Sequence, residues 1–149
     1  MAVDFQFVSA FLCERTLQEK QDEVLSAIRL VDTFLVPVDR PEHFAIQFAL
    51  VWSFRTLTPP DPAGYRLGIT LIRSTGDRER LIEPTEMQPQ AKFVDASIPW
   101  GIAGAVPVRL LVRNLGTAFL EIEVNGTVVT RVPFTLLEPP APQTSEQTS

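Results

Sequence analysis

Large hydrophobic residues alternate with small or polar ones along much of this chain, with the period of two that a pleated strand imposes. The clearest run covers residues 44–55. A helix would scatter its large side chains around the whole circumference, whereas a strand places them on one face. The pattern therefore predicts a strand with one buried face, which carries Phe44, Ile46, Phe48, Leu50, Trp52 and Phe54.

Further segments alternate in the same way. The additional expected strands are residues 5–13, 24–36, 65–73, 107–114, 116–124 and 128–137, with a short edge strand at 80–83. About seven or eight strands at this spacing, without long helices between them, indicate an all-β fold. We expect an antiparallel two-sheet β-sandwich, immunoglobulin-like or similar, with a closed barrel as the second interpretation.

Turn and loop chemistry separates these strands. Residues 57–64 contain three prolines, which lack the N–H group that a strand ladder needs, and they predict a stiff loop. Residues 14–22 are polar and predict a loop or a short helical turn, and Pro-Trp-Gly at 99–101 predicts another loop. We expect one sandwich domain over residues 1–137, followed at 138–149 by a disordered tail of Pro, Gln, Thr and Ser.

The last hairpin turns at Asn125-Gly126. A two-residue turn there would place Glu121 and Glu123 on the face of Phe134, among core residues. An odd-length loop, with the glycine in the left-handed conformation, shifts the parity and puts both glutamates outside with Arg131. We therefore predict the odd loop. The residues expected inside are Leu120, Ile122, Val124, Val128, Val132, Phe134 and Leu136.

Charge and composition narrow the class of partner. The chain has 149 residues, with 13 Lys and Arg against 18 Asp and Glu, a formal net charge of −5 and no cluster of basic residues. Nucleic acids and anionic membranes need such a cluster, so neither is an expected partner. One cysteine excludes an intrachain disulfide. The first residues lack a signal-peptide pattern and no apolar run approaches the ~20 residues of a membrane helix, so we expect a cytoplasmic protein.

Glu121 and Glu123 are the most obvious pair of acidic residues, two positions apart on one strand face. General acid–base catalysis needs carboxyls whose environments separate their pKa values within a cleft. Arg131, together with Arg109 and Arg113 on the preceding strand, can lie across from them. We therefore interpret these residues as a solvated cross-strand charge ladder.

The sequence assigns no catalytic residue, cofactor or metal. His43, the only histidine, lies in a loop, and Cys13 lies on an apolar strand face, which is typical of a buried, inert thiol. An enzyme would require the histidine and Asp32 to converge with Cys13 or Glu14, which their positions along the predicted strands and loops oppose. The loop aspartates are solitary and predict no calcium site; they are Asp39, Asp61, Asp77 and Asp95.

Asp32 is the polar residue to which we assign a structural role. It interrupts the apolar face of a predicted strand between Leu30 and Phe34. Either the strand has a bulge there, or the carboxylate accepts hydrogen bonds from nearby backbone or from an arginine.

Two sets of residues are candidates for a binding surface. Ala45, Ala49 and Val51 are small apolar residues on the outer face of the 44–55 strand, where they could pack against another chain. The alternative is that this strand is central and is covered by loops of its own chain. Tyr65 and Trp100 are aromatic residues that could stack against a sugar, provided that they are exposed and coplanar.

Three segments resemble an uncharacterised bacterial family. They are Leu12-Cys13-Glu14, residues 26–34 with Asp32-Thr33-Phe34 at their end, and the hairpin of residues 119–126. Members of this family are small single-domain proteins of unknown function with a β-sandwich fold. The resemblance implies that fold and a bacterial cytoplasmic setting, and it brings no catalytic residues.

The function expected from these observations is that of a non-enzymatic interaction or accessory protein without a cofactor. Its partner would be another protein or a second copy of the chain, bound through a sheet face or an edge strand. The alternative function is a small-molecule or carbohydrate-binding module with Tyr65 and Trp100 near its site.

Overall fold

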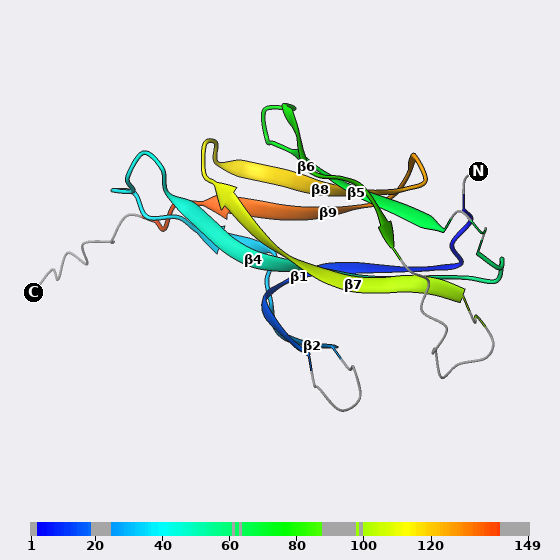
Figure 1. Ribbon diagram of the computed structural model, residues 1–149. Helices are drawn as coiled ribbons and strands as arrows, with labels where there is room; N and C mark the ends of the chain where they lie inside the picture. Colours follow the sequence, from blue (N-terminus) through cyan, green and yellow to red (C-terminus); the bar gives the residue numbers. More distant parts are fainter. Residues whose placement is uncertain are drawn as a thin grey trace, which may run out of the picture.

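The computed structural model describes residues 3–18, 25–60, 62, 64–87, 98 and 100–140. These residues form nine strands in two sheets that pack face to face, and they contain no helix (Figure 1). The predicted all-β sandwich is therefore confirmed. No helix that could cross a membrane occurs in this part of the chain.

The two sheets contain four and five strands. Sheet A consists, in spatial order, of β2 (Leu25–Leu30), β1 (Phe7–Gln18), β4 (Ala45–Thr56) and β7 (Trp100–Leu111). Sheet B consists of β3 (Thr33–Leu35), β9 (Thr127–Leu137), β8 (Gly116–Val124), β5 (Tyr65–Ile72) and β6 (Arg78–Met87). All neighbouring strands are antiparallel except β3 and β9, which are parallel.

The strand order follows that of an immunoglobulin-type sandwich. β1, β4 and β7 are neighbours as strands A, B and E are, and β9, β8, β5 and β6 are neighbours as strands G, F, C and C′ are. The β5–β6 and β8–β9 connections are hairpins within sheet B, while the β7–β8 connection crosses between the sheets. Strands adjacent in sequence are thus often not adjacent in space.

The core lies between the sheets, and β4 contributes four of its buried side chains, Phe48, Leu50, Trp52 and Phe54. The alternation predicted for β4 is confirmed, with Phe48, Leu50 and Phe54 buried on the inner face. They pack against the inner faces of β5, β8 and β9, whose buried residues are Tyr65, Leu67, Ile69, Leu71, Ala118, Leu120, Ile122, Val124, Val132, Phe134 and Leu136. Each fully buried large apolar side chain stabilises the fold by about 1.5–3 kcal/mol.

Two strands extend beyond their predicted ends. β1 continues through Arg15 to Gln18, where a loop or helical turn was expected, because β2 pairs with this half of the strand. β7 begins at Trp100, inside the expected loop, because the long β4 offers a partner as far as Thr56. Residues 19–22 of the predicted loop lie outside the described residues.

The single strand predicted over residues 24–36 is wrong, because the chain changes sheets in the middle of it. The Val31 amide donates to the Leu12 carbonyl in sheet A at 3.0 Å, and the Asp32 carbonyl accepts from the Thr135 amide in sheet B at 2.8 Å. Leu30, expected in the core, is 68% exposed. The Asp32 side chain lies exposed at this crossing rather than at a bulge, and its carboxylate accepts a hydrogen bond from the Thr33 hydroxyl at 3.2 Å.

In the β8–β9 hairpin the predicted odd-length loop is wrong, but the predicted placement of Glu121 on the outer face with Arg131 is confirmed. Asn125 (φ 51°) and Gly126 (φ 81°) form a two-residue turn, not an odd-length loop. The parity shift comes instead from an extra residue in β9, since Glu123 pairs with Val128 and Ile122 with Thr130. Glu121 therefore faces outward opposite Arg131, as predicted, whereas Val128, expected inside, is 44% exposed.

The end of the described chain is tied to the sandwich. Arg40 Nη1 donates to Glu138 Oε1 at 2.9 Å, just beyond the end of β9. Of the predicted disordered tail, residues 138–140 are described and residues 141–149 lie outside the described residues.

Candidate functional site

The small residues expected to form an open surface on β4 are mostly covered. Ala49 is 5% exposed and Val51 is 7% exposed, and together with Cys13 they form a small apolar cluster on the outer side of sheet A. Phe11 and Ala105 pack against this cluster, while Ala45 is half-buried. The expectation of an open apolar surface is therefore corrected for Ala49 and Val51, and β4 is a central strand between β1 and β7.

The aromatic residues proposed as a stacking platform do not form one. Tyr65 is 1% exposed, its ring packs against Phe5, and burial raises the pKa of its phenol. Trp100 is half-buried at the first position of β7, opposite Thr56. No ring contact joins Tyr65 to Trp100 among the described residues.

The residues considered for catalysis lie in different settings. His43 is exposed in the loop before β4, and Asp32 is exposed between β2 and β3. Cys13 is completely buried, as predicted, and its thiol donates to the Arg15 carbonyl at 3.4 Å. Within the described ranges, no three His, Cys, Asp or Glu side chains are grouped so that they could hold a metal ion.

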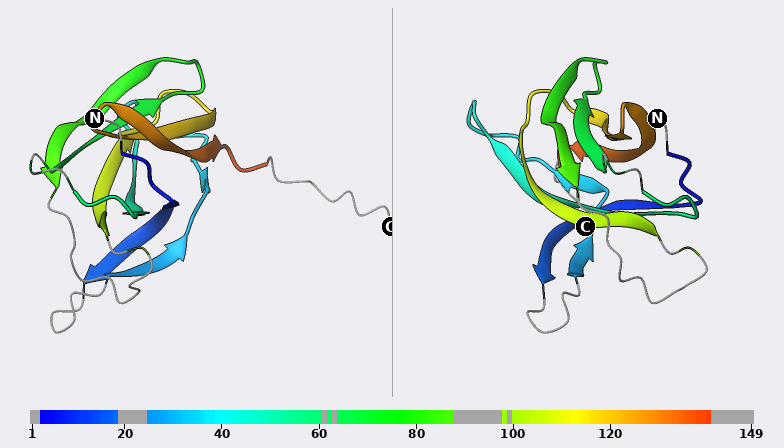
Figure 2. Two further views of the ribbon diagram at one scale, coloured as in Figure 1. Left: turned by 90° about the vertical axis from the view of Figure 1, so that its right-hand side faces the viewer. Right: turned by 45° about the vertical axis from the view of Figure 1, so that its right-hand side comes forward.

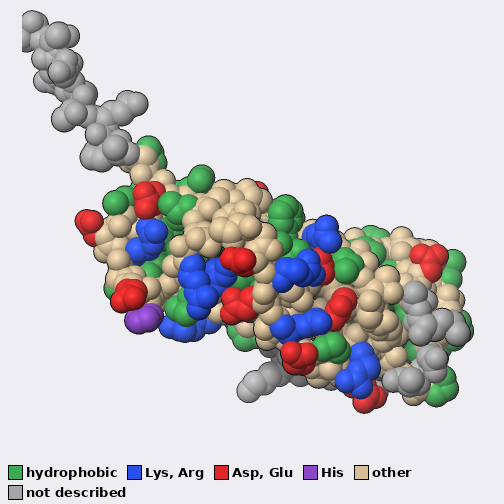
Figure 3. Space-filling model, turned by 90° about the horizontal axis from the view of Figure 1, so that it is seen from above, with side chains coloured by type: hydrophobic (Ala, Val, Ile, Leu, Met, Phe, Trp, Pro, Cys, Tyr) green, Lys and Arg blue, Asp and Glu red, His purple; other side chains and the backbone are tan. Residues whose placement is uncertain are grey.

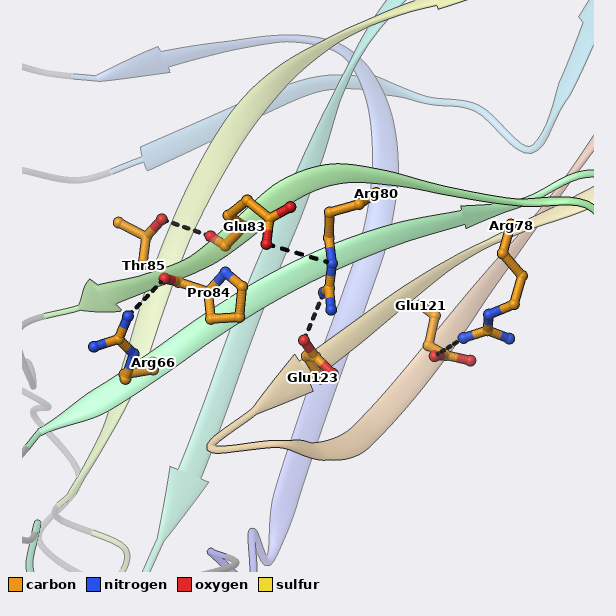
Figure 4. A network of polar contacts seen from close by, with 8 residues as sticks. All are labelled: Arg66, Arg78, Arg80, Glu83, Pro84, Thr85, Glu121 and Glu123. Carbon is orange, nitrogen blue, oxygen red and sulfur yellow. Dashed lines mark hydrogen bonds and ion pairs between the residues drawn. The ribbon is translucent and has the colours of Figure 1, made fainter.

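Acidic and basic side chains alternate on the outer face of sheet B (Figure 3). Glu121 is 4% exposed and accepts a hydrogen bond from Arg78 Nη2 at 2.6 Å (Figure 4). It accepts a second hydrogen bond from Arg131 Nε at 2.8 Å. Burial raises the pKa of Glu121, but the hydrogen bonds and positive charges of these two arginines outweigh it and lower the pKa overall. The arginines thus hold this carboxylate ionised, which does not suit a general acid.

A second ion pair continues this network. Arg80 Nη1 lies 2.5 Å from Glu123 Oε1, and the two side chains meet above Gly68 of β5. The predicted charge ladder is therefore present, but it is not solvated at Glu121, which is buried, and its partners are partly different from those predicted. Arg78 and Arg80 come from β6, whereas the expected Arg109 lies in β7, in the other sheet.

Sheet A has an open seam where β1 separates from β4. The two strands pair from Phe7 to Cys13, and the last pair is Cys13 with Ala49. Beyond it, within the described part of the chain, β1 stays paired only with β2, while β4 stays paired only with β7. Figures 1 and 2 show β1 and β2 curving together out of the plane of sheet A, away from sheet B.

Backbone groups on both sides of this seam face one another. The Val112 amide donates to the Phe44 carbonyl, so even-numbered residues of β4 bond toward β7, and Ala45 and Gln47 direct their N–H and C=O groups toward β1. The Leu12 carbonyl accepts from the Val31 amide on the β2 side, so even-numbered residues of β1 bond toward β2. Arg15, an odd-numbered residue, therefore directs its N–H and C=O groups toward β4.

No backbone hydrogen bond spans the seam among the described residues. The Arg15 carbonyl has the Cys13 thiol as a weak donor. The seam is thus a break in the sheet that leaves strand-edge groups open on β4 and on β1.

A groove of about 530 Å³ occupies the seam. Its lining residues are Glu14, Arg15, Thr16, Gln47, Phe48, Ala49, Pro107, Val108 and Arg109. The volume lies within the range of roughly 300–1,000 Å³ that is usual for binding pockets. The groove combines apolar atoms with the side chains of two arginines.

The charged side chains that line the groove differ in whether they have an ion-pair partner. Glu14 lies 3.4 Å from Arg29 in an exposed ion pair. Arg15 and Arg109 are exposed, and neither side chain has an ion pair or hydrogen bond to any described residue. In a chain with a net charge of −5, the groove is therefore a local site of positive charge.

No protein-family model matches the chain, and neither a curated protein nor a solved structure matches it. The resemblance to an uncharacterised bacterial family stays a prediction. The site therefore has to be judged from its geometry. Arg15 and Gln47, which are central to the seam, were missed by the sequence analysis because their proximity follows from strand register and from the point where pairing ends.

Proposed function

We propose that this protein is a non-enzymatic interaction module that binds an extended segment of another polypeptide in the open seam of sheet A. The observation that carries the proposal is a pair of strand edges, on Gln47 of β4 and Arg15 of β1, that have no backbone partner among the described residues and face a groove of about 530 Å³. An extended peptide offers alternating N–H and C=O groups, which are what such edges lack.

The contrast with the two edges of sheet B supports this choice of site. β6, at one edge of sheet B, carries Pro84 and charged side chains such as Arg78, Glu79 and Glu83, which discourage strand pairing. β3, at the opposite edge, spans only Thr33–Leu35. The β4 side of the seam lacks such protection, because Ala45 and Gln47 are small or uncharged and their backbone groups point into a concave space.

The groove lining also suits a peptide. Ala49, Pro107 and Val108 provide apolar contact, and Gln47 and Thr16 provide neutral hydrogen-bonding groups. Strand addition draws affinity from the main chain and specificity from pockets for alternate side chains. The carbohydrate-binding alternative loses its support, because it required an exposed aromatic pair and Tyr65 is buried.

Selection from a phage-displayed library of random decapeptides tests the proposal. The decisive variants are Gln47→Pro, which removes the N–H that faces the seam, and Gln47→Ala, which removes the side chain but keeps the N–H. We expect selected peptides to bind wild type and Gln47→Ala equally and to bind Gln47→Pro roughly tenfold or more weakly.

Thermal unfolding of both variants provides the control, since neither change breaks a ladder bond and both proteins should remain folded. Peptides that bind Gln47→Pro as tightly as wild type would contradict strand addition at the seam. A library that yields no seam-dependent binder would contradict it as well.

A further inference from the structure

We infer that the segment bound in the seam presents an acidic side chain, which is received between Arg15 and Arg109. This inference rests on the proposed function and adds the chemistry of the partner. Both arginines line the groove and neither has a partner among the described residues. A carboxylate is the group that matches two guanidinium groups by charge-assisted hydrogen bonds.

The register of sheet A places these residues in one row. Gln47 lies directly opposite Arg109, and continuation of the Cys13–Ala49 pairing would bring Arg15 opposite Gln47. Directly opposite residues have their side chains on the same face of a sheet. A strand added to β4 in the seam would therefore have one residue in this row, with Arg15 on one side and Gln47 and then Arg109 on the other.

Arg109 would have to reach over Gln47 to touch that residue, and this protein already contains the same geometry. Neighbouring strands are about 4.8 Å apart, so residues two strands apart are roughly 10 Å apart at the backbone. Arg80 of β6 spans this distance to reach Glu123 of β8 across β5 (Figure 4). Arg78 reaches Glu121 in the same way.

The neighbouring rows define what should accompany the acidic residue. Toward Ala49 the seam closes, because β1 and β4 are paired there. Toward the other end, the next row on the same face is Ala45 opposite Leu111, and both residues are half-buried. The bound segment should thus have an apolar side chain two positions away from its acidic one, on the side that faces Ala45.

Fluorescence anisotropy with designed peptides tests the inference. The probe is an acetylated and amidated decapeptide of alternating threonine and valine with one central glutamate. Two control peptides are used. One has glutamine in place of the glutamate, and the other keeps the glutamate and carries N-methyl groups on alternate backbone amides. We expect the glutamate peptide to bind wild-type protein roughly tenfold more tightly than the glutamine peptide, and less so at high salt.

The variants Arg15→Gln and Arg109→Gln should each weaken binding of the glutamate peptide toward that of the glutamine peptide and leave the latter unchanged. Arg113→Gln is the matched control, because Arg113 is exposed and lies outside the groove lining. It should change neither affinity.

The outcomes separate this inference from the proposed function. Equal affinity for the glutamate and glutamine peptides would overturn the acidic preference and leave strand addition standing. Undiminished binding of the N-methylated glutamate peptide would overturn strand addition. Displacement of the glutamate peptide by millimolar inorganic phosphate would reveal a general anion site and overturn the acidic-peptide inference. Absence of binding by every peptide would overturn both.

Discussion

Gly68 and Glu123 lie directly opposite each other on β5 and β8, and the absent side chain of the glycine leaves the space in which the carboxylate meets Arg80. A Cβ atom at Gly68 would lie 2.7 Å from Glu123 Oε1 and 2.8 Å from Arg80 Nη1. The ion pair therefore depends on a residue that takes no part in it.

Gly68→Ala should uncouple Arg80 from Glu123 without unfolding the protein, because the atoms in the way are the ends of flexible side chains. In a double-mutant cycle of Arg80→Ala and Glu123→Ala, we expect a coupling free energy of about 0.5–1 kcal/mol. With alanine at position 68, the coupling should fall close to zero. Urea unfolding measures each variant, and an unchanged coupling energy would show that the pair does not need this space.

Glu121→Gln should lower the free energy of unfolding at neutral pH by about 1–3 kcal/mol, because the amide can accept from only one of the two arginines and the negative charge that both arginines face is removed. Glu83→Gln is the control, since the side chain of Glu83 is 83% exposed. It should leave stability nearly unchanged. A Glu121→Gln protein as stable as wild type would mean that the arginines gain as much from water as from this carboxylate.

The same carboxylate predicts a pH dependence of stability. Arg78 and Arg131 lower the pKa of Glu121 below its ordinary value of 4.5, so the unfolded chain binds a proton at a higher pH than the folded one. The contribution of ionised Glu121 to the free energy of unfolding is fully present above pH 4.5 and is lost as the pH falls through the pKa of Glu121 in the folded protein. Urea midpoints measured from neutral to acidic pH should therefore fall less steeply below pH 4.5 in Glu121→Gln than in wild type.

Gly126→Ala should destabilise the protein by about 1–2 kcal/mol through the backbone alone. Gly126 has φ 81°, a left-handed conformation, and a Cβ there would meet no atom within 4 Å. Gly126→Asn is the matched comparison, because asparagine tolerates this region and should cost less. Chemical unfolding of the two variants checks the order, and equal losses would point away from a conformational cause.

Arg73 should contribute more to stability than its position after β5 suggests. Its guanidinium group is buried, donates to the Leu111 carbonyl of sheet A at 3.2 Å and pairs with Glu79 of sheet B at 3.0 Å. Arg73→Met should lower the free energy of unfolding by about 1.5–3 kcal/mol, since hydrogen bonds to charged groups are lost. Arg113→Met, at an exposed position, should change it by less than about 0.5 kcal/mol. Similar losses in both would contradict a tie between the sheets.

The strands that could be predicted from the sequence are those with two contrasting faces. β4 and β8 each bury one face and turn the other away from the main core, so their alternation is strong and their positions agree closely with the expected ones. The second half of β1 has no such contrast. It pairs along its backbone with β2, Glu14 and Arg15 are exposed, and its polar sequence is typical of a loop.

Spatial relationships between strands were harder to predict than the strands themselves. Arg109 was expected beside Glu121 because its strand precedes β8, but the chain crosses to the other sheet between them. The crossing at Asp32 was missed for a related reason, since alternation does not record which sheet a residue joins. The seam depends on where one pairing ends, which no local pattern encodes.

The second half of β1 and its partner β2 form a ribbon, and no described strand pairs with it on a third side. Isolated two-stranded ribbons are marginally stable in water, because they bury little surface and gain only their own ladder. The ribbon is joined to the rest of sheet A at Cys13, the last residue of β1 that pairs with β4. Because this ribbon gains little beyond its own ladder, we expect bending at Cys13 to widen the gap beside β4 at a lower energetic cost than opening the sandwich, so that the proposed strand could enter without disrupting the core.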